Sequence, residues 1–131
     1  MKQKVLICGA TGFVGRNMLE SFIKNDNYDV KALWHKRTDL TEVYREGVEW
    51  VHADLTKKHD VKDVFNGGID IVLLAYGTLS NQKSCQQSVT ETLSEINTNA
   101  LSTISLLTLI ANHFEAKKDG TICVISSVAG D

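Results

Sequence analysis

The fold is decided by residues 4–16, which read Lys-Val-Leu-Ile-Cys-Gly-Ala-Thr-Gly-Phe-Val-Gly-Arg. The apolar run from Val5 to Cys8 is typical of a buried strand. It is followed by Gly9, Gly12 and Gly15 at three-residue intervals, and an amphipathic helix is expected to begin there. A strand, a glycine turn and a helix in this order are typical of the phosphate-binding start of a dinucleotide-binding fold. The alternative interpretation is an ordinary turn between a strand and a helix.

Each of the three glycines has its own expected role. Gly9 turns the chain sharply off the strand, and Gly15 allows the helix to pack closely against the sheet. Gly12 has no Cβ and lets a pyrophosphate approach the backbone amides at the helix N-terminus, where the helix dipole favours negative charge. Arg16 follows the last glycine and would add positive charge. The expected phosphate-site residues are Gly9, Thr11, Gly12, Phe13, Val14, Gly15 and Arg16.

The composition is that of an ordinary soluble globular domain. The 131 residues are 43% hydrophobic and 23% charged, with a formal net charge of −2. This charge gives no general attraction to nucleic acid or to an anionic membrane, and no apolar run is long enough to span a membrane. The three cysteines and four histidines show no metal-binding or disulfide spacing. We therefore expect a cytoplasmic protein with reduced thiols that binds no metal, nucleic acid or membrane.

The hydrophobic pattern alternates between strands and helices along the whole chain. Because strands alternate with helices, we expect right-handed crossovers and a parallel sheet. The predicted fold is α/β: one domain over residues 1–131, with a three-layer, Rossmann-like, doubly wound parallel sheet of five strands in the order 3-2-1-4-5. Strands are expected at 5–8, 30–34, 48–51, 69–74 and 121–125, helices at 12–25, 57–65 and 89–114, at most a short helix at 40–46, and a polar loop at 77–88.

The helix expected at 89–114 has a wide apolar surface. One side of it would face the sheet, and the other side needs a second cover. The strand at 121–125 would also have a bare edge. We therefore expect a homodimer formed through helix 89–114 or through the edge of strand 121–125. The predicted apolar stripe is Val89, Leu93, Ile96, Ala100, Ile104, Leu107, Ala111 and Phe114, and Leu101, Leu106, Leu109 and Ile110 widen it.

Basic residues follow the second expected strand. In doubly wound sheets ligands bind beyond the carboxyl ends of the strands. An acidic residue after the second strand would bind a ribose 2′-hydroxyl, whereas a cationic residue accommodates a 2′-phosphate. His35, Lys36 and Arg37 stand at this place, so NADP is predicted in preference to NAD. The alternative is a solvated basic loop.

The ends of the other strands complete the predicted site. Asp54 could accept a hydrogen bond from the adenine amino group, with Leu55 against the ring, or it could instead cap a helix that begins near Thr56. The small residues of the segment Ala75-Tyr76-Gly77 would let the cofactor ribose approach the backbone. Ser126 and Ser127, after the fifth strand, would face the nicotinamide and the substrate.

These motifs together resemble the short-chain dehydrogenase/reductase family over the whole chain. The family's glycine fingerprint matches residues 9–15, its adenine-site Asp matches Asp54, and its Asn-Asn-Ala-Gly segment survives only as residues 75–77. The resemblance implies that Ser127 is the catalytic serine. It also implies that Asn97 is the family's helix asparagine, a structural and proton-relay residue, although Asn99 is the other candidate.

The sequence departs from this family in its catalytic pair. The family's acid/base tyrosine and its partner lysine form a Tyr-x-x-x-Lys motif downstream of the serine, and the sequence ends at Asp131 before such a motif. Without them a carbonyl has no proton donor. We therefore expect a nucleotide-binding half-domain that is catalytically incomplete. The alternatives are a structural or engineered scaffold whose relic site holds no cofactor, and an oxidoreductase completed by another chain.

The two parts of the sequence resemble different branches of the family. The Gly9/Gly12/Gly15 spacing is similar to that of the extended, epimerase-like branch, whereas residues 76–131 are similar to the shorter, single-domain branch. One hypothesis is a chimera of two relatives, fused near residues 67–71.

Overall fold

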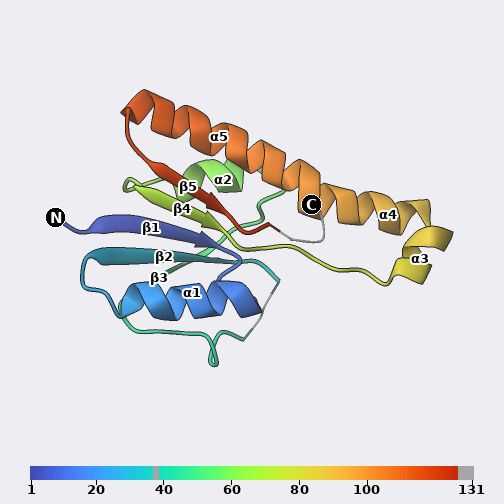
Figure 1. Ribbon diagram of the computed structural model, residues 1–131, viewed down its shortest axis with the longest axis horizontal. Coiled ribbons are helices and arrows are strands. Elements are labelled where there is room, and N and C mark those ends of the chain that lie inside the picture. The colour runs from blue at the N-terminus through green and yellow to red at the C-terminus, as the bar shows by residue number, and fades with distance from the viewer. Residues whose placement is uncertain (37–38, 127–131) are drawn as a thin grey trace.

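The computed structural model describes residues 1–36 and 39–126, and they form one five-stranded sheet between helices (Figure 1). All strand pairs are parallel, in the order β3-β2-β1-β4-β5. The predicted α/β class and strand order are therefore confirmed. The strands are β1 (Gln3–Cys8), β2 (Tyr28–Trp34), β3 (Glu49–His52), β4 (Ile71–Leu74) and β5 (Thr121–Val124).

The core lies on both faces of the central strand β1, which pairs with β2 and β4. Helix α1 (Phe13–Ile23) covers one face of the sheet, and α2 (Lys58–Val64) and α5 (Ser102–Lys117) cover the other (Figure 1). Because side chains alternate along a strand, Val5 and Ile7 pack on the α1 side, whereas Leu6 and Cys8 pack against α2 and α5. These four residues are fully buried. Burial on both faces explains why β1 has a continuous apolar run.

Two of the predicted segments differ from the structure. The segment 77–88 is not entirely loop, because it contains the short helix α3 (Gln82–Gln87). The Asn81 side chain caps this helix by accepting hydrogen bonds from the backbone N–H groups of Lys83 (2.9 Å) and Ser84 (3.3 Å). Residues 41–43 form a turn rather than a helix, and this turn buries Val43.

The long helix predicted at 89–114 is present, but it is interrupted. It consists of α4 (Val89–Ile96), the π-helical turn η1 (Asn97–Leu101) and α5. Its α4 part lies beyond the carboxyl ends of the strands (Figure 1), and none of its residues is buried. Part of the predicted apolar surface therefore faces the sheet, and part of it remains exposed. The buried residues of α5 are Ser102, Leu106, Ile110 and Phe114, whereas Val89, Leu93, Ile96, Leu101 and Ile104 are exposed.

The remaining sequence-based exclusions concern membranes, metals and thiols. Within residues 1–36 and 39–126, no helix is long and apolar enough to cross a membrane, and no three His, Cys, Asp or Glu side chains gather where they could hold a metal ion. The three cysteines are free. Burial raises the pKa of the Cys8 thiol to about 12, so this thiol stays protonated at neutral pH.

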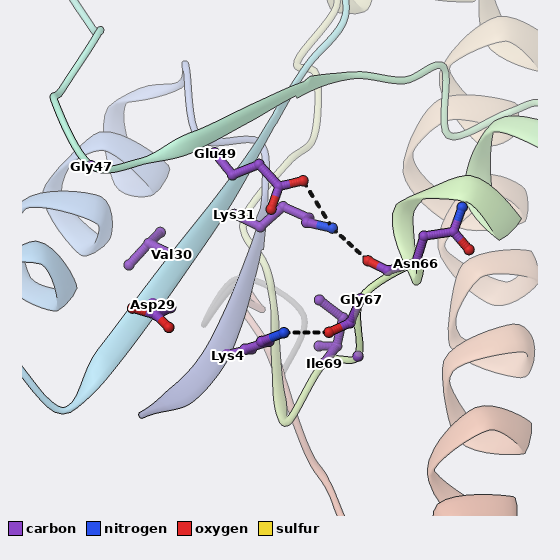
Figure 2. Close-up of a pocket in the computed structure, with 10 residues that line it drawn as sticks. Lys4, Asp29, Val30, Lys31, Gly47, Glu49, Asn66, Gly67 and Ile69 are labelled. Atoms are coloured by element: carbon purple, nitrogen blue, oxygen red, sulfur yellow. Dashed lines mark hydrogen bonds and ion pairs between the residues drawn. The ribbon is translucent and has the colours of Figure 1, made fainter. Parts of the chain in front are cut away.

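A buried lysine binds the C-terminal end of α2 (Figure 2). The side chain of Lys31 is only 11% exposed, and its ammonium lies 3.2 Å from the Glu49 carboxylate. It donates hydrogen bonds to the carbonyl oxygens of Val64 (3.3 Å) and Asn66 (2.9 Å). The last carbonyls of a helix lack intrahelical partners and carry partial negative charge, so a cation there is stabilising.

Lys4, on the neighbouring strand β1, acts in the same way by donating to the carbonyl oxygen of Gly67 (Figure 2). A cavity of about 290 Å³ opens beside these two lysines. Since both ammonium groups are already bound to protein oxygens, we assign the pair a structural role: it joins α2 to the amino ends of β1 and β2.

Replacing Lys31 should destabilise the fold. Lys31→Met leaves two helix-end carbonyls without their donor, and we expect a loss of about 1–3 kcal/mol in the free energy of unfolding. Urea denaturation followed by circular dichroism would measure it. The matched control is Lys24→Met, because Lys24 is exposed at the end of α1. Equal stability of the two variants would contradict the role given to Lys31.

Candidate functional site

The glycine turn between β1 and α1 is packed tightly against the neighbouring backbone. Gly9 has a φ of +85°, and a Cβ there would lie 2.7 Å from the carbonyl oxygen of Ala75. A Cβ on Gly15 would collide with the carbonyl oxygen of Gly9. Gly12 differs, because its φ is −79° and the nearest described atom to an added Cβ would be 3.4 Å away. Packing therefore requires glycine at positions 9 and 15, but it leaves the backbone at Gly12 open.

The N-terminus of α1 remains available for an anion. Gly12 is its N-cap residue, and within the described residues no side chain caps the helix and no acidic residue stands in its first turn. The first backbone N–H groups of a helix have no intrahelical acceptors, and the helix dipole makes this end positive. The turn therefore has the form expected of a phosphate site.

A cleft of about 540 Å³ lies beside this turn, at the carboxyl ends of the strands. Its walls come from the glycine turn, the ends of β2 and β3, the segment after β4, and the junction of α4 with η1. The structure thus brings together, as lining residues, the predicted site residues Gly9, Thr11, His35, Lys36, Asp54, Leu55, Tyr76, Gly77 and Asn97.

The other predicted residues that the structure describes do not line this cleft. Arg37 and Ser127 lie outside the described residues, and Ser126 is exposed just beyond β5. Ala75 continues β4 and donates its N–H to the carbonyl oxygen of Cys8 at 2.9 Å. The residues of the first turn of α1 and its cap stand next to the cleft without lining it: Gly12, Phe13, Val14, Gly15 and Arg16.

Asp54 is tied into a local turn at one end of the cleft. Its Oδ1 accepts hydrogen bonds from the backbone N–H (3.0 Å) and hydroxyl (2.6 Å) of Thr56. Its Oδ2 lies 3.4 Å from Nε2 of His35 and 3.9 Å from Nζ of Lys57. The Thr56 hydroxyl, helped by these nearby cations, lowers the pKa of Asp54. Asp54 does not cap α2, because the N-cap position belongs to Lys57.

Several lining residues were not found from the sequence. Trp34 ends β2, and its ring packs on that of His52, with the ring centroids 4.5 Å apart. Nε2 of His52 lies 3.1 Å from the carbonyl oxygen of His35. The pattern of β2 predicted a buried strand, but it did not show that the last aromatic residue faces the cleft. The lining residues that the sequence analysis missed are Leu33, Trp34, Ala53, Thr56, Thr78, Ser94, Glu95 and Thr98.

Asn99 holds the segment that follows β4. Its side-chain oxygen accepts from the N–H of Thr78 (2.7 Å), and its amide nitrogen donates to the carbonyl oxygen of Thr78 (2.8 Å). A Cβ on Gly77 would lie 3.2 Å from the same side-chain oxygen, so Gly77 permits this approach. Asn97, two residues earlier in η1, lines the cleft instead. The two candidate asparagines therefore have different positions, one beside the cleft and one behind its wall.

Glu95 completes this clamp from the last turn of α4. Its carboxylate accepts from the Thr78 hydroxyl (2.8 Å), the Ser80 backbone N–H (3.3 Å) and the Asn99 amide (3.2 Å). Hydrogen bonds from Ser80 and Thr78 lower the pKa of Glu95. Tyr76 anchors the same segment to α5, since its hydroxyl lies 3.0 Å from the Ser102 hydroxyl. The wall beyond β4 is therefore fixed before any ligand binds.

Comparison with known proteins identifies the family. The model of the NAD dependent epimerase/dehydratase family matches residues 5–130, which is nearly the whole chain. The chain belongs to this family. The match runs across residues 67–71, where the sequence suggested a junction, and the chimera stays a prediction. None of the curated proteins matches the chain.

Solved structures of similar fold include short-chain dehydrogenases. The structure of ElxO with NADP bound is 26% identical, with a TM-score of 0.83, and the match covers 99% of this chain and 57% of ElxO. The short-chain dehydrogenase from Sphingobium yanoikuyae in complex with NADPH is 25% identical, with a TM-score of 0.80, and the match covers 98% and 54% of the two chains. The chain corresponds to a Rossmann half-domain and spans little more than half the length of these proteins.

Serine dehydrogenase from Escherichia coli shares the fold, with 22% identity, a TM-score of 0.77, and coverage of 98% of this chain and 63% of that one.

Alanine substitutions should distinguish Gly9 and Gly15, which have no room for a Cβ, from Gly12, which has. Gly9→Ala and Gly15→Ala force a Cβ into backbone atoms, and we expect each to lower the free energy of unfolding by about 1–3 kcal/mol. Gly12→Ala should cost less than about 1 kcal/mol, because Ala is only a poorer N-cap residue than Gly. Thermal unfolding of the three variants tests this order. A Gly12→Ala variant as unstable as Gly15→Ala would contradict it.

Proposed function

We propose that this chain binds a nicotinamide dinucleotide in the cleft of about 540 Å³, as the cofactor-binding half of a short-chain oxidoreductase. The observation that carries the proposal is the open backbone at Gly12, at an uncapped helix N-terminus beside the cleft. A pyrophosphate fits such a terminus in both charge and geometry. ElxO, 26% identical, is known with NADP bound.

The strand ends give the two halves of the dinucleotide different surroundings. The adenosine half would lie toward His35, Asp54 and Leu55, because these residues follow β2 and β3. The nicotinamide half would lie toward Tyr76, Gly77 and Asn97, in the wall fixed by Asn99 and Glu95. When bound, the nicotinamide supplies hydride transfer.

NADP is the cofactor that this site favours over NAD. His35 and Lys36 follow β2 and line the cleft, and no acidic side chain stands between Trp34 and Lys36 to bind a 2′-hydroxyl. Arg37 adds a third basic residue in the sequence. Cationic side chains at this strand end accommodate a 2′-phosphate.

Binding without turnover is the activity proposed for these 131 residues alone. Asn97 and the two serines at 126 and 127 are the candidate residues for orienting a carbonyl substrate. None of Tyr28, Tyr44 and Tyr76 is followed four residues later by lysine. A carbonyl reduction therefore needs a proton donor from other residues than these, such as those of another chain.

A titration with NADPH and, separately, NADH tests the cofactor proposal. Nicotinamide fluorescence should show saturable binding of both, with NADPH about tenfold tighter, since one charge-assisted contact to phosphate is worth about that much. Gly12→Ala serves as the matched variant, and it should weaken both ligands at nearly unchanged thermal stability. No binding of either ligand at about millimolar concentration would instead identify the cleft as a relic of the fold.

We also propose that the exposed apolar face of α4 and α5 is covered by a second copy of the chain. Val89, Leu93 and Ile104 are 76%, 59% and 60% exposed, and with Ile96 and Leu101 they continue along one long helix. Apolar surface of this extent on a single element is typical of an interface. The edge of β5, which within the described residues pairs with β4 alone, is the alternative contact.

Sedimentation velocity distinguishes these two contacts. The unmodified chain should sediment as a dimer, and Leu93→Glu should weaken it by at least about tenfold in Kd, because a charge would be buried in an apolar interface. Leu79→Glu is the matched control, since Leu79 is fully exposed on the loop after β4. A dimer that resists Leu93→Glu would favour the β5 edge, and a monomeric unmodified chain would contradict both contacts.

A further inference from the structure

The imidazole of His35 and the carboxylate of Asp54 lie close together at the adenosine end of the cleft. Nε2 of His35 lies 3.4 Å from Oδ2 of Asp54, and the side chains are 42% and 16% exposed. The other carboxylate oxygen of Asp54 is occupied by two hydrogen bonds from Thr56. Asp54 therefore turns its remaining oxygen toward the imidazole, which stays accessible to a ligand in the cleft.

The backbone of His35 is held in place from the neighbouring strand. Nε2 of His52 lies 3.1 Å from the carbonyl oxygen of His35, and the His52 ring packs against Trp34. The imidazole of His35 thus contacts Asp54, and its backbone carbonyl contacts His52, so that both parts of the residue have a partner at the end of β2. A group held in this way can act on a ligand without a large ordering cost.

Imidazole is the side chain whose charge changes near neutral pH. A protonated His35 would carry one positive charge between the Asp54 carboxylate and the space beyond β2. A neutral His35 would offer a 2′-phosphate no charge, and NAD lacks this phosphate altogether. Charge-assisted bonds to phosphate are about twice as strong as neutral ones.

We propose that Asp54 positions His35 so that the protonated imidazole binds the cofactor's 2′-phosphate. The preference for NADP over NAD then falls as the pH rises. This inference rests on the proposed dinucleotide binding, and it assigns His35 the charge that discriminates between the two cofactors. Asp54 acts through His35 as a positioning residue.

The other charged groups near His35 do not produce the same effect. Lys36 and Lys57 keep their positive charge throughout the neutral range, and Asp54 keeps its negative charge there. Glu95 lines the same cleft from α4, and it too is ionised in this range. Among the described residues around His35, His52 is the other imidazole, and its Nε2 lies 3.1 Å from the His35 carbonyl oxygen.

The test is a set of binding curves for NADPH and NADH between about pH 6.5 and 8.5, where the 2′-phosphate stays mostly doubly charged. For the unmodified chain, the Kd of NADPH should rise about tenfold across this range, because one charge-assisted contact is lost, while the Kd of NADH stays constant. Calorimetry in buffers of different ionisation enthalpy should also show proton uptake with NADPH and none with NADH.

Two substitutions of His35 test whether its protonation causes the pH dependence. His35→Gln should bind NADPH weakly with no pH dependence, and His35→Lys should bind it tightly with no pH dependence, because the lysine charge does not titrate in this range. Thermal unfolding should show that both variants fold, and the readout is the pH slope of each NADPH curve rather than the absolute affinity. His59→Gln is the control, because His59 is an exposed histidine that is not among the residues lining the cleft, and it should keep the slope.

Three results would overturn the inference: a flat NADPH curve for the unmodified chain, the same slope in His35→Gln, or loss of the slope in His59→Gln alone. Failure of the proposed function looks different, because then neither NADPH nor NADH binds at any pH. If both cofactors bind and only the slope is missing, dinucleotide binding stands and the role given to His35 falls.

Discussion

The close contact between Gly9 and Gly15 is the constraint on which the cleft depends. It brings the first turn of α1 onto the backbone at the end of β1, with no room for a side chain between them. This contact sets the helix N-terminus directly beside the carboxyl end of the central strand. The backbone of Ala75, at the end of the neighbouring β4, closes on Gly9 from the other side. One turn therefore joins β1, α1 and β4 at the point where the ligand site lies.

Most of the fold could be predicted because its central strands β1, β2 and β4 are largely buried. Val5–Cys8 and Val72–Leu74 have continuous apolar runs, and glycines or polar residues interrupt the chain between strands. The failures come from structure that no apolar period encodes. The capping side chain of Asn81 starts α3, and the turn at 41–43 is stabilised by burial of Val43. The face of α5 that is buried depends on where α2 and the sheet lie, which is tertiary information.

The location of the site residues could be predicted more readily than the contacts that they make. His35, Asp54 and Tyr76 each follow a strand and were for that reason expected near one another, and all three line one cleft. The sequence could not show that Thr56 donates a hydrogen bond to one carboxylate oxygen of Asp54, since that bond depends on the local turn. Nor could it separate Asn97 from Asn99. The π-helical turn η1 widens the helix at these residues, so that one amide lines the cleft and the other grips the backbone of Thr78.

The central position of β1 also has a consequence for synthesis on the ribosome. Lys4 and Asp70, at the start of the β1–β4 pairing, are 66 residues apart in the sequence. At about 5–20 residues per second, a nascent chain carries the exposed edge of β1 for several seconds before β4 emerges. The edge offers the fully buried, wholly apolar run Val5–Cys8, a segment well suited to pairing with other chains. The order of the strands in space, 3-2-1-4-5, thus leaves β1 in need of protection until its partner β4 has been synthesised.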